Sequence, residues 1–294
     1  MILVTGATGT VGREVVRELR AHDEPVRAAS RDAERTRERH GDDATWVSFD
    51  FTRPETYYPA LEGVDAVFLV RPPAVSRVGR DIVPFLDSAA RMGVGHVTFL
   101  SVLGAEKNPL LPHRRIERHL SALAAKGAVT YTFLRASFFV QNLLTEHRRD
   151  VVDNDRLFLP AGDGATSFVD ARDVAAVGAV TLVETGHENR AYDLTGPAAL
   201  TYHDVADVLT AELGREIRDV DPAIPRFATT MYRRGRLLPF LLVMVGLYTL
   251  VRLGFAGRVS DDVRRVLGRD ARSLRTVVRD NRAAFGADDG SRDE

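Results

Sequence analysis

The residues with the clearest chemical purpose are three glycines near the amino terminus. They lie in the stretch Thr5-Gly6-Ala7-Thr8-Gly9-Thr10-Val11-Gly12. Glycine lets the chain turn sharply and lets its backbone approach a diphosphate without a Cβ in the way. A helix that begins here would direct free N–H groups and the positive end of its dipole at the anion. We therefore predict a dinucleotide phosphate site whose cofactor-binding residues are Gly6, Thr8, Gly9, Thr10, Val11 and Gly12.

The end of the second predicted strand bears on which dinucleotide binds. An acid at this place favours NAD, whereas an arginine accommodates the 2′-phosphate of NADP. The strand ends in Ser30, Arg31 and Asp32, and a guanidinium can bind a phosphate through two parallel hydrogen bonds. We predict NADP, with Ser30 and Arg31 as cofactor ligands. Asp32 keeps NAD open as an alternative, and Arg31 could instead simply begin a solvated helix.

The hydrophobic pattern predicts the elements that position these residues. Short apolar runs alternate with amphipathic stretches, which indicates a parallel sheet with helices on both faces. We expect strands at 2–5, 25–30, 45–49, 66–70, 96–101, 129–134, 166–169 and 191–195. We expect helices within 11–19, 31–40, 82–90, 116–123, 171–183 and 202–213. The fold class is a doubly wound, Rossmann-like α/β fold with a smaller, mostly C-terminal α/β substrate lobe.

The expected domains are an NAD(P)-binding domain at 1–150, a substrate lobe at 151–287 interleaved with the sheet, and a disordered tail at 288–294. The chain has 294 residues, no cysteine and a net charge of −1. Disulfides, thiolate catalysis and zinc–sulfur sites are excluded, no metal site is expected, and the charge does not favour a nucleic-acid partner. Neither a G-x-S-x-G elbow nor an H-E-x-x-H motif occurs, which argues against a hydrolase. No signal peptide is recognisable, so a cytoplasmic location is expected.

Three later segments carry a family resemblance. Residues 130–142, 168–175 and 192–197 resemble segments of the NmrA-like family of atypical short-chain dehydrogenase/reductases, the first matching its pattern YT-x-LR-x-x-x-F-x-x-N. With the glycine stretch, the similarity covers roughly residues 1–215 and is strongest to the type-2 NAD(P)H:quinone oxidoreductases of that family. The resemblance implies an NAD(P)H-binding oxidoreductase.

The Tyr-x-x-x-Lys catalytic pair of the wider superfamily is absent from this sequence. Ser101 matches the position of the superfamily's catalytic serine. Aligning Glu117-Arg118-His119-Leu120 with the family's E-K-x-L places Arg118 at the lysine and Arg114 at the tyrosine. Arginine can hydrogen-bond a nicotinamide ribose but does not readily give up a proton. The catalytic candidates are Ser101, His113 and Arg118, with Arg118 also contacting the cofactor; His113 could instead be an ordinary surface histidine.

The missing tyrosine favours an electrophilic acceptor. Reducing a simple ketone makes a strongly basic alkoxide, so a site must supply a proton. Reducing a quinone makes a far weaker base, so hydride delivery and proton uptake from water suffice. Our first hypothesis is an oxidoreductase acting on a quinone-like or other electrophilic small molecule. The alternatives are a non-catalytic, redox-sensing NADP-binding regulator of a protein partner and, third, an isomerase or reductase acting on a sugar or isoprenoid.

Further candidates follow the predicted strands, where ligands bind in open sheets. The superfamily places an acid near the adenine at the position of Asp50, for which a surface turn is the alternative. The other predicted cofactor contacts are Val70, Arg71, Pro72 and Phe138. The predicted substrate contacts are Arg114, Phe139 and Asn142. Core packing is the alternative for the two phenylalanines.

The segment 237–251 carries no charged residue. It is shorter than the roughly twenty residues that a bilayer requires. Three arginines precede it and two follow it, namely Arg233, Arg234, Arg236, Arg252 and Arg258. We expect a helix that lines an apolar acceptor pocket or forms a homodimer face. An in-plane contact with a membrane surface, with access to lipid-soluble quinones, is the alternative.

Overall fold

The structure is a computed structural model that describes residues 1–41 and 44–286. The predicted tail at 288–294 lies outside the described residues. The chain divides into two units, of which unit 1 comprises residues 1–136, 171–194 and 262–269. Unit 2 comprises residues 137–170, 195–261 and the chain from 270 onward. This division differs from the expected boundary after residue 150, because 137–150 pack within unit 2 while 171–194 and 262–269 return to unit 1.

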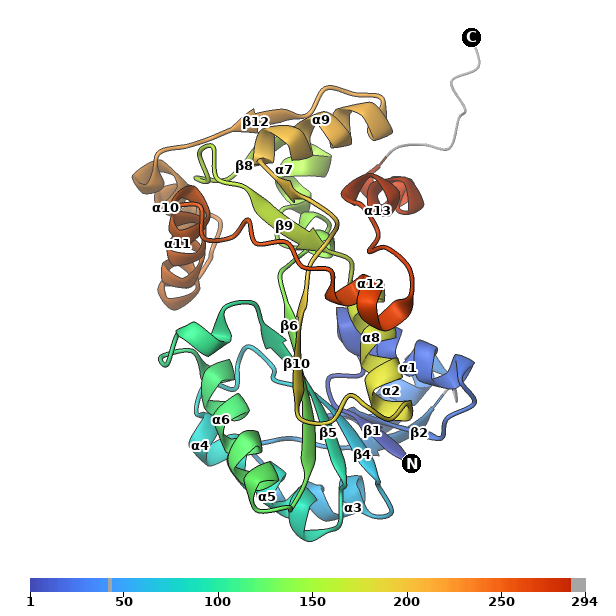
Figure 1. Cartoon of the computed structure of the whole chain (residues 1–294). Coiled ribbons are helices and arrows are strands. Elements are labelled where there is room, and N and C mark those ends of the chain that lie inside the picture. The colour runs from blue at the N-terminus through green and yellow to red at the C-terminus, as the bar shows by residue number, and fades with distance from the viewer. Residues whose placement is uncertain (42–43, 287–294) are drawn as a thin grey trace. The chain divides into compact units, whose positions relative to one another are not determined.

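Unit 1 is built on a seven-stranded sheet in the order β10-β6-β5-β4-β1-β2-β3, with every neighbouring pair parallel (Figure 1). Its strands are β1 (Ile2–Val4), β2 (Val26–Ser30), β3 (Thr45–Ser48), β4 (Ala66–Val70), β5 (His96–Val102), β6 (Thr130–Ala136) and β10 (Arg190–Leu194). The order reverses between β1 and β4, and the crevice at such a reversal is where open α/β sheets bind ligands. The predicted doubly wound, Rossmann-like fold is confirmed.

Helices cover both faces of this sheet, because successive strand residues point to opposite sides. Val67 and Leu69 pack with Phe85 of α5 and Ile116 of α6. Phe68, between them, faces Gly178 of α8, where an added Cβ would lie 2.7 Å from the phenylalanine ring. The helices of unit 1 are α1 (Thr10–Ala21), α2 (Ala33–His40), η1 (Pro54–Thr56), α3 (Tyr57–Leu61), α4 (Val78–Asp81), α5 (Val83–Arg91), η2 (Ala105–Lys107), α6 (Pro112–Ala125), α8 (Ala171–Val183) and α12 (Asp262–Leu267).

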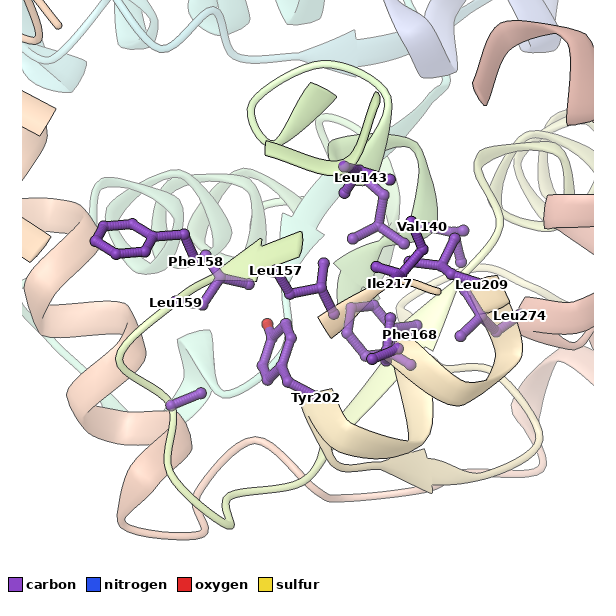
Figure 2. Packing of buried hydrophobic residues seen from close by; sticks show 14 of the residues in the cluster. Val140, Leu143, Leu157, Phe158, Leu159, Phe168, Tyr202, Leu209, Ile217 and Leu274 are labelled. Carbon is purple, nitrogen blue, oxygen red and sulfur yellow. The ribbon is translucent and has the colours of Figure 1, made fainter. Parts of the chain in front are cut away.

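Unit 2 is a smaller mixed α/β assembly. Its strands form the sheet β11-β9-β7 and the pair β12-β8, with bounds β7 (Phe138–Phe139), β8 (Arg156–Phe158), β9 (Thr166–Val169), β11 (Ala199–Leu200) and β12 (Arg218–Val220). Its helices are η3 (Val140–Leu143), α7 (Arg148–Asp153), α9 (Tyr202–Leu213), α10 (Ile224–Arg233), α11 (Leu238–Arg252), α13 (Leu274–Asp280) and η4 (Arg282–Phe285). Figure 2 shows part of its own hydrophobic core, in which Leu157, Phe168 and Tyr202 are buried.

The predicted helix in the apolar segment 237–251 is confirmed as α11. It is 15 residues long, and its buried residues are Leu241, Met244, Tyr248 and Val251. This spacing of three and four residues places the four side chains on one helix face, which packs into the core of unit 2. Across the described part of the chain, no helix has both the length and the apolar character that a membrane crossing demands.

Candidate functional site

The glycine stretch forms a tight turn between β1 and α1. Gly6 has a φ of +63°, and a Cβ added to it would lie 3.0 Å from the Cβ of Val70. A Cβ added to Gly12 would lie only 2.1 Å from the carbonyl oxygen of Gly6. The amide of Gly9 donates to that same oxygen at 2.9 Å, which closes the turn. Gly6 and Gly12 therefore hold a backbone shape that larger residues would break.

The first turn of α1 leaves its amides available to a ligand. Gly9 is the N-cap residue, and no side chain caps this helix end. Thr8, Gly9 and Thr10 are exposed. The first amides of a helix have no partner inside the helix and carry its positive dipole end. The turn lies at the strand reversal between β1 and β4, and its shape and free donors fit a diphosphate.

Thr5 fixes the start of this turn to the neighbouring strand. Its Oγ1 accepts a hydrogen bond of 2.8 Å from the amide of Val70 and lies 3.2 Å from the carbonyl oxygen of Phe68. The side chain is fully buried. Thr5 was not among the predicted site residues, although a polar residue that ends an apolar strand is a signal that could have indicated it.

Arg71 and His113 place unsatisfied polar atoms beside the carboxyl end of β4. The Nη1 of Arg71 donates to the carbonyl oxygens of Pro72 at 3.1 Å and Val75 at 2.9 Å. Its Nε and the Nδ1 of His113 are buried and have no hydrogen-bond partner among the described residues. Buried polar atoms are usually paired, so these two favour a polar ligand here.

His113 is neutral at physiological pH. Burial, and then the charge of Arg71, lowers its pKa from 6.5 to about 4. Its ring stacks on Phe99 with 6.0 Å between the centroids. A neutral imidazole can donate or accept a hydrogen bond, but it is not a cationic acid. This environment suits a hydrogen-bonding role for His113 better than proton donation.

Ser101 is held in a buried charge network. Its Oγ donates to Oε1 of Glu117 at 2.8 Å, and Nε and Nη2 of Arg135 each donate to the same carboxylate at 3.0 Å. Glu117 is fully buried, and Arg114 adds a contact of 3.4 Å. Arg118 lies instead on an exposed face of α6. The structure therefore joins Ser101 to Arg114 through Glu117, a partner that the sequence did not indicate.

The predicted adenosine side is arranged around the start of α2. Asp32 caps this helix, because its Oδ1 accepts from the amide of Arg35 at 3.1 Å. Ser30 bonds to Thr36 with 2.6 Å between their hydroxyl oxygens. Arg31 is exposed and forms no ion pair with any described residue. With the Asp32 carboxylate engaged as a cap, Arg31 is the side chain at this strand end that is available to an anion.

Asp50 forms a turn after β3. Its Oδ1 accepts from both the amide and the hydroxyl of Thr52 at 2.8 Å. This is the surface turn that the sequence left open as an alternative. An adenine contact for Asp50 stays a prediction.

Unit 2 contains an apolar cavity of about 200 Å³. The three predicted residues Phe138, Phe139 and Asn142 line it together. The other lining residues are Leu143, Glu146, His147, Phe168, Tyr202, Phe240, Val243, Met244, Leu247 and Tyr248. Segment 237–251 therefore lines a pocket through α11, as one of the sequence alternatives proposed.

A buried histidine–tyrosine pair lies in this cavity wall. Nε2 of His147 lies 2.8 Å from the hydroxyl oxygen of Tyr248. Burial lowers the pKa of His147 to about 4 and raises that of Tyr248 well above its usual value. Both side chains are therefore neutral near pH 7. Sequence reasoning missed this pair, and no local signal could have joined residues 101 positions apart.

The parallel sheet with its strand reversal and glycine turn defines a Rossmann-like protein of the dinucleotide-binding type. The chain belongs to the NmrA-like family, whose model matches residues 1–231, as the resemblance in the sequence predicted.

Two relatives and one solved structure resemble the whole chain. An NAD(P)H azoreductase of Xenophilus azovorans is 35% identical and covers 98% of this chain and 100% of its own length. The (4-alkanoyl-5-oxo-2,5-dihydrofuran-3-yl)methyl phosphate reductase of Streptomyces griseus is 32% identical. The match covers 97% of this chain and 99% of the reductase. The solved structure is that of the NADPH-dependent quinone oxidoreductase of Escherichia coli with NADPH, which has a TM-score of 0.82 at 23% identity. The match covers 95% of this chain and 98% of that chain. The similarity to the quinone oxidoreductase structure is a similarity of fold alone.

Proposed function

We propose that this protein is an NAD(P)H-dependent oxidoreductase that binds NADP at the glycine turn and reduces a quinone-like or other electrophilic small molecule. NAD is the alternative cofactor. The turn itself carries the proposal, because Gly12 admits no Cβ beside the Gly6 carbonyl and the α1 amides lack a side-chain cap. Two whole-length relatives named as reductases support it, one of them an NAD(P)H azoreductase.

Backbone amides and side chains of unit 1 would bind different parts of the cofactor. The amides of Thr8, Thr10 and Val11 would bind the diphosphate, and Arg31 the 2′-phosphate. The buried, unpaired nitrogens of Arg71 and His113 would form hydrogen bonds with polar groups of the cofactor. When bound, a reduced nicotinamide supplies a hydride. These contacts would bind and orient the cofactor without themselves donating a proton.

The surroundings of Ser101 and His113 favour an acceptor that needs no strong protein acid. The Ser101 hydroxyl already donates to Glu117, and His113 is neutral above about pH 4. No tyrosine–lysine pair is available in the sequence. Because a reduced quinone is a weak base, its protons can come from water. An aliphatic ketone, whose alkoxide is strongly basic, is a poor substrate for such a site.

The cavity of unit 2 supplies the expected binding surface for the acceptor. Phe138, Phe139 and Phe168 give it aromatic walls, and Asn142 adds an amide. Such walls suit a flat, conjugated molecule, since aromatic rings stack favourably on one another. With a volume of about 200 Å³, the cavity fits a compact ring system better than an extended dye.

Turnover with a panel of acceptors tests the proposal. Purified full-length protein is mixed with NADPH and, in separate assays, a benzoquinone, a naphthoquinone, an azo dye and an aliphatic ketone. We expect NADPH consumption above the uncatalysed rate with the quinones and none with the ketone. Saturable NADPH binding without turnover of any acceptor would contradict the enzymatic proposal and support the redox-sensing regulator.

A further inference from the structure

The helix α11 is apolar on both of its long faces. Its inner face is buried in unit 2, whereas Leu238, Leu242, Val243 and Leu250 expose between 49% and 65% of their surface. A surface helix normally carries polar side chains on the face opposite its core contacts. Before the final residue Arg252, the exposed residues of α11 are all apolar, so this face is suited to an apolar environment other than water.

The helices α10 and α11 form a hairpin (Figure 1) that carries arginines and no acidic residue. Residues 222–260 contain six arginines and no aspartate, glutamate or lysine, although the whole chain has a net charge of −1. Three of these arginines are paired: Arg234 with Asp150 at 3.0 Å, Arg236 with Glu146 at 2.9 Å and Arg252 with Asp221 at 3.1 Å. Arg226 and Arg233 are exposed on α10 and form no ion pair with any described residue.

Aromatic side chains lie at both ends of the apolar face. Tyr232 precedes α11 and Phe255 follows it, and both are well exposed. Aromatic rings and arginines at the borders of an apolar helix face are typical of helices that lie in the plane of a membrane interface. The helix is 15 residues long, which suits lying along a surface.

We infer that the outer face of α11 docks onto an anionic lipid surface, with the apolar side chains in the acyl boundary and the arginines of the hairpin at the headgroups. Charge complementarity favours lipid over a second copy of this chain. In a twofold dimer the same patch meets itself, so two hairpins whose exposed, unpaired charges are Arg226 and Arg233 would adjoin. Anionic headgroups instead attract each exposed arginine.

Docking would also bring lipid to a wall of the cavity. Phe240, Val243 and Leu247 line the cavity and are exposed on α11. If the cavity binds the acceptor, which rests on the function proposed above, lipid-dissolved acceptors would reach it from the membrane. Lipid binding itself does not depend on that function, so it is tested without a turnover assay.

Vesicle flotation with the full chain tests the inference. Phosphatidylcholine vesicles with about 30 mol % phosphatidylglycerol are compared with phosphatidylcholine alone, and we expect at least about tenfold stronger binding to the anionic vesicles. The double variant Leu242→Glu/Leu250→Glu should lose about tenfold in binding. The variant Leu110→Glu, which changes an exposed leucine of unit 1, should bind like the wild type.

A second double variant tests how much the arginines contribute to vesicle binding apart from the apolar side chains. Arg226→Ser/Arg233→Ser leaves the apolar face intact, and we expect about tenfold weaker binding to anionic vesicles at low salt. Equal or absent binding of the wild type to both vesicle types would overturn the inference. So would sedimentation of the wild type as a dimer that Leu242→Glu/Leu250→Glu dissociates, because a second copy would then cover the face.

Discussion

The glycine turn of unit 1 and the cavity of unit 2 are built in opposite ways. The turn uses consecutive residues 5–12 and works mainly through its backbone. The cavity gathers side chains from β7, η3, β9, α9 and α11, over a span from Phe138 to Tyr248. A backbone site can therefore be predicted from a short motif, whereas a side-chain cavity depends on how distant elements pack.

Two buried polar clusters, one in each unit, are of different kinds. Unit 1 buries an ionic network around Glu117, while the cavity wall of unit 2 buries the neutral pair His147–Tyr248. A buried charge is costly when it loses its partner, and a buried neutral histidine is costly only when it must accept a proton. The Glu117 network and the His147–Tyr248 pair should therefore respond to different perturbations.

The largest effect is expected from Glu117→Ala. This change leaves the guanidinium of Arg135 and the hydroxyl of Ser101 without their buried partner. The free energy of unfolding should fall by about 3–5 kcal/mol in urea denaturation. Ser101→Ala is the milder comparison, with an expected loss of about 1 kcal/mol. A loss below about 1 kcal/mol for Glu117→Ala would show that the network is not the polar anchor of unit 1.

Acid should destabilise the protein through its buried histidines. The pKa of His147 is about 4 in the folded chain and 6.5 in the reference state, so the unfolded chain binds a proton that the native chain excludes between these values. The free energy of unfolding should therefore fall as pH drops from about 7 to about 5, by roughly 2 kcal/mol for this histidine. His96 and His113, with pKa values also about 4, should add similar losses.

In the variant His147→Gln, the free energy of unfolding should fall less between about pH 7 and about pH 5 than in the wild type. The difference is the contribution of His147, because glutamine does not titrate. Urea denaturation at several pH values measures it. An acid dependence identical to that of the wild type would contradict the neutral state of His147.

Arg31→Ala should change cofactor preference rather than folding. The side chain is exposed beside the Asp32 cap, and removing it deletes a phosphate ligand. We expect the preference for NADPH over NADH to fall about tenfold. Arg35→Ala, on the same exposed helix, is the matched control and should keep the preference. An undiminished preference in Arg31→Ala would remove this residue from the site.

Val243→Trp should have the smallest effect, and it should change the binding of the acceptor without changing the binding of NADPH. Val243 lines the cavity but is also exposed, so a larger ring can be accommodated while it narrows the space. The KM for a naphthoquinone should rise about fivefold, with the Kd for NADPH unchanged. Steady-state kinetics and calorimetry measure the two constants. An unchanged KM would argue that the acceptor binds elsewhere.

Local patterns predicted much of the fold. The strands at 66–70 and 166–169 and the helices at 171–183 and 202–213 have the predicted bounds. Strands β8 and β12 have only three residues each, too few to show an alternation, and they were missed.

The site was predictable to the extent that it is local. The turn from Gly6 to Gly12 follows from its spacing, and Phe138, Phe139 and Asn142 do line one cavity. The partner of Ser101 lies 16 residues away on another element, and that of His147 lies 101 residues away. Such pairs are set by tertiary packing, which no short window of sequence contains.

Calorimetric titration with NADPH tests the central claim most directly. The wild type and Gly79→Ala, whose added Cβ meets nothing within 4 Å, should bind NADPH saturably. Gly12→Ala should bind at least about 100-fold more weakly, because its Cβ would collide with the Gly6 carbonyl and spoil the turn. If the wild type gives neither heat nor a shift in melting temperature with millimolar NADPH, or if Gly12→Ala binds equally well, the glycine turn is not the cofactor site.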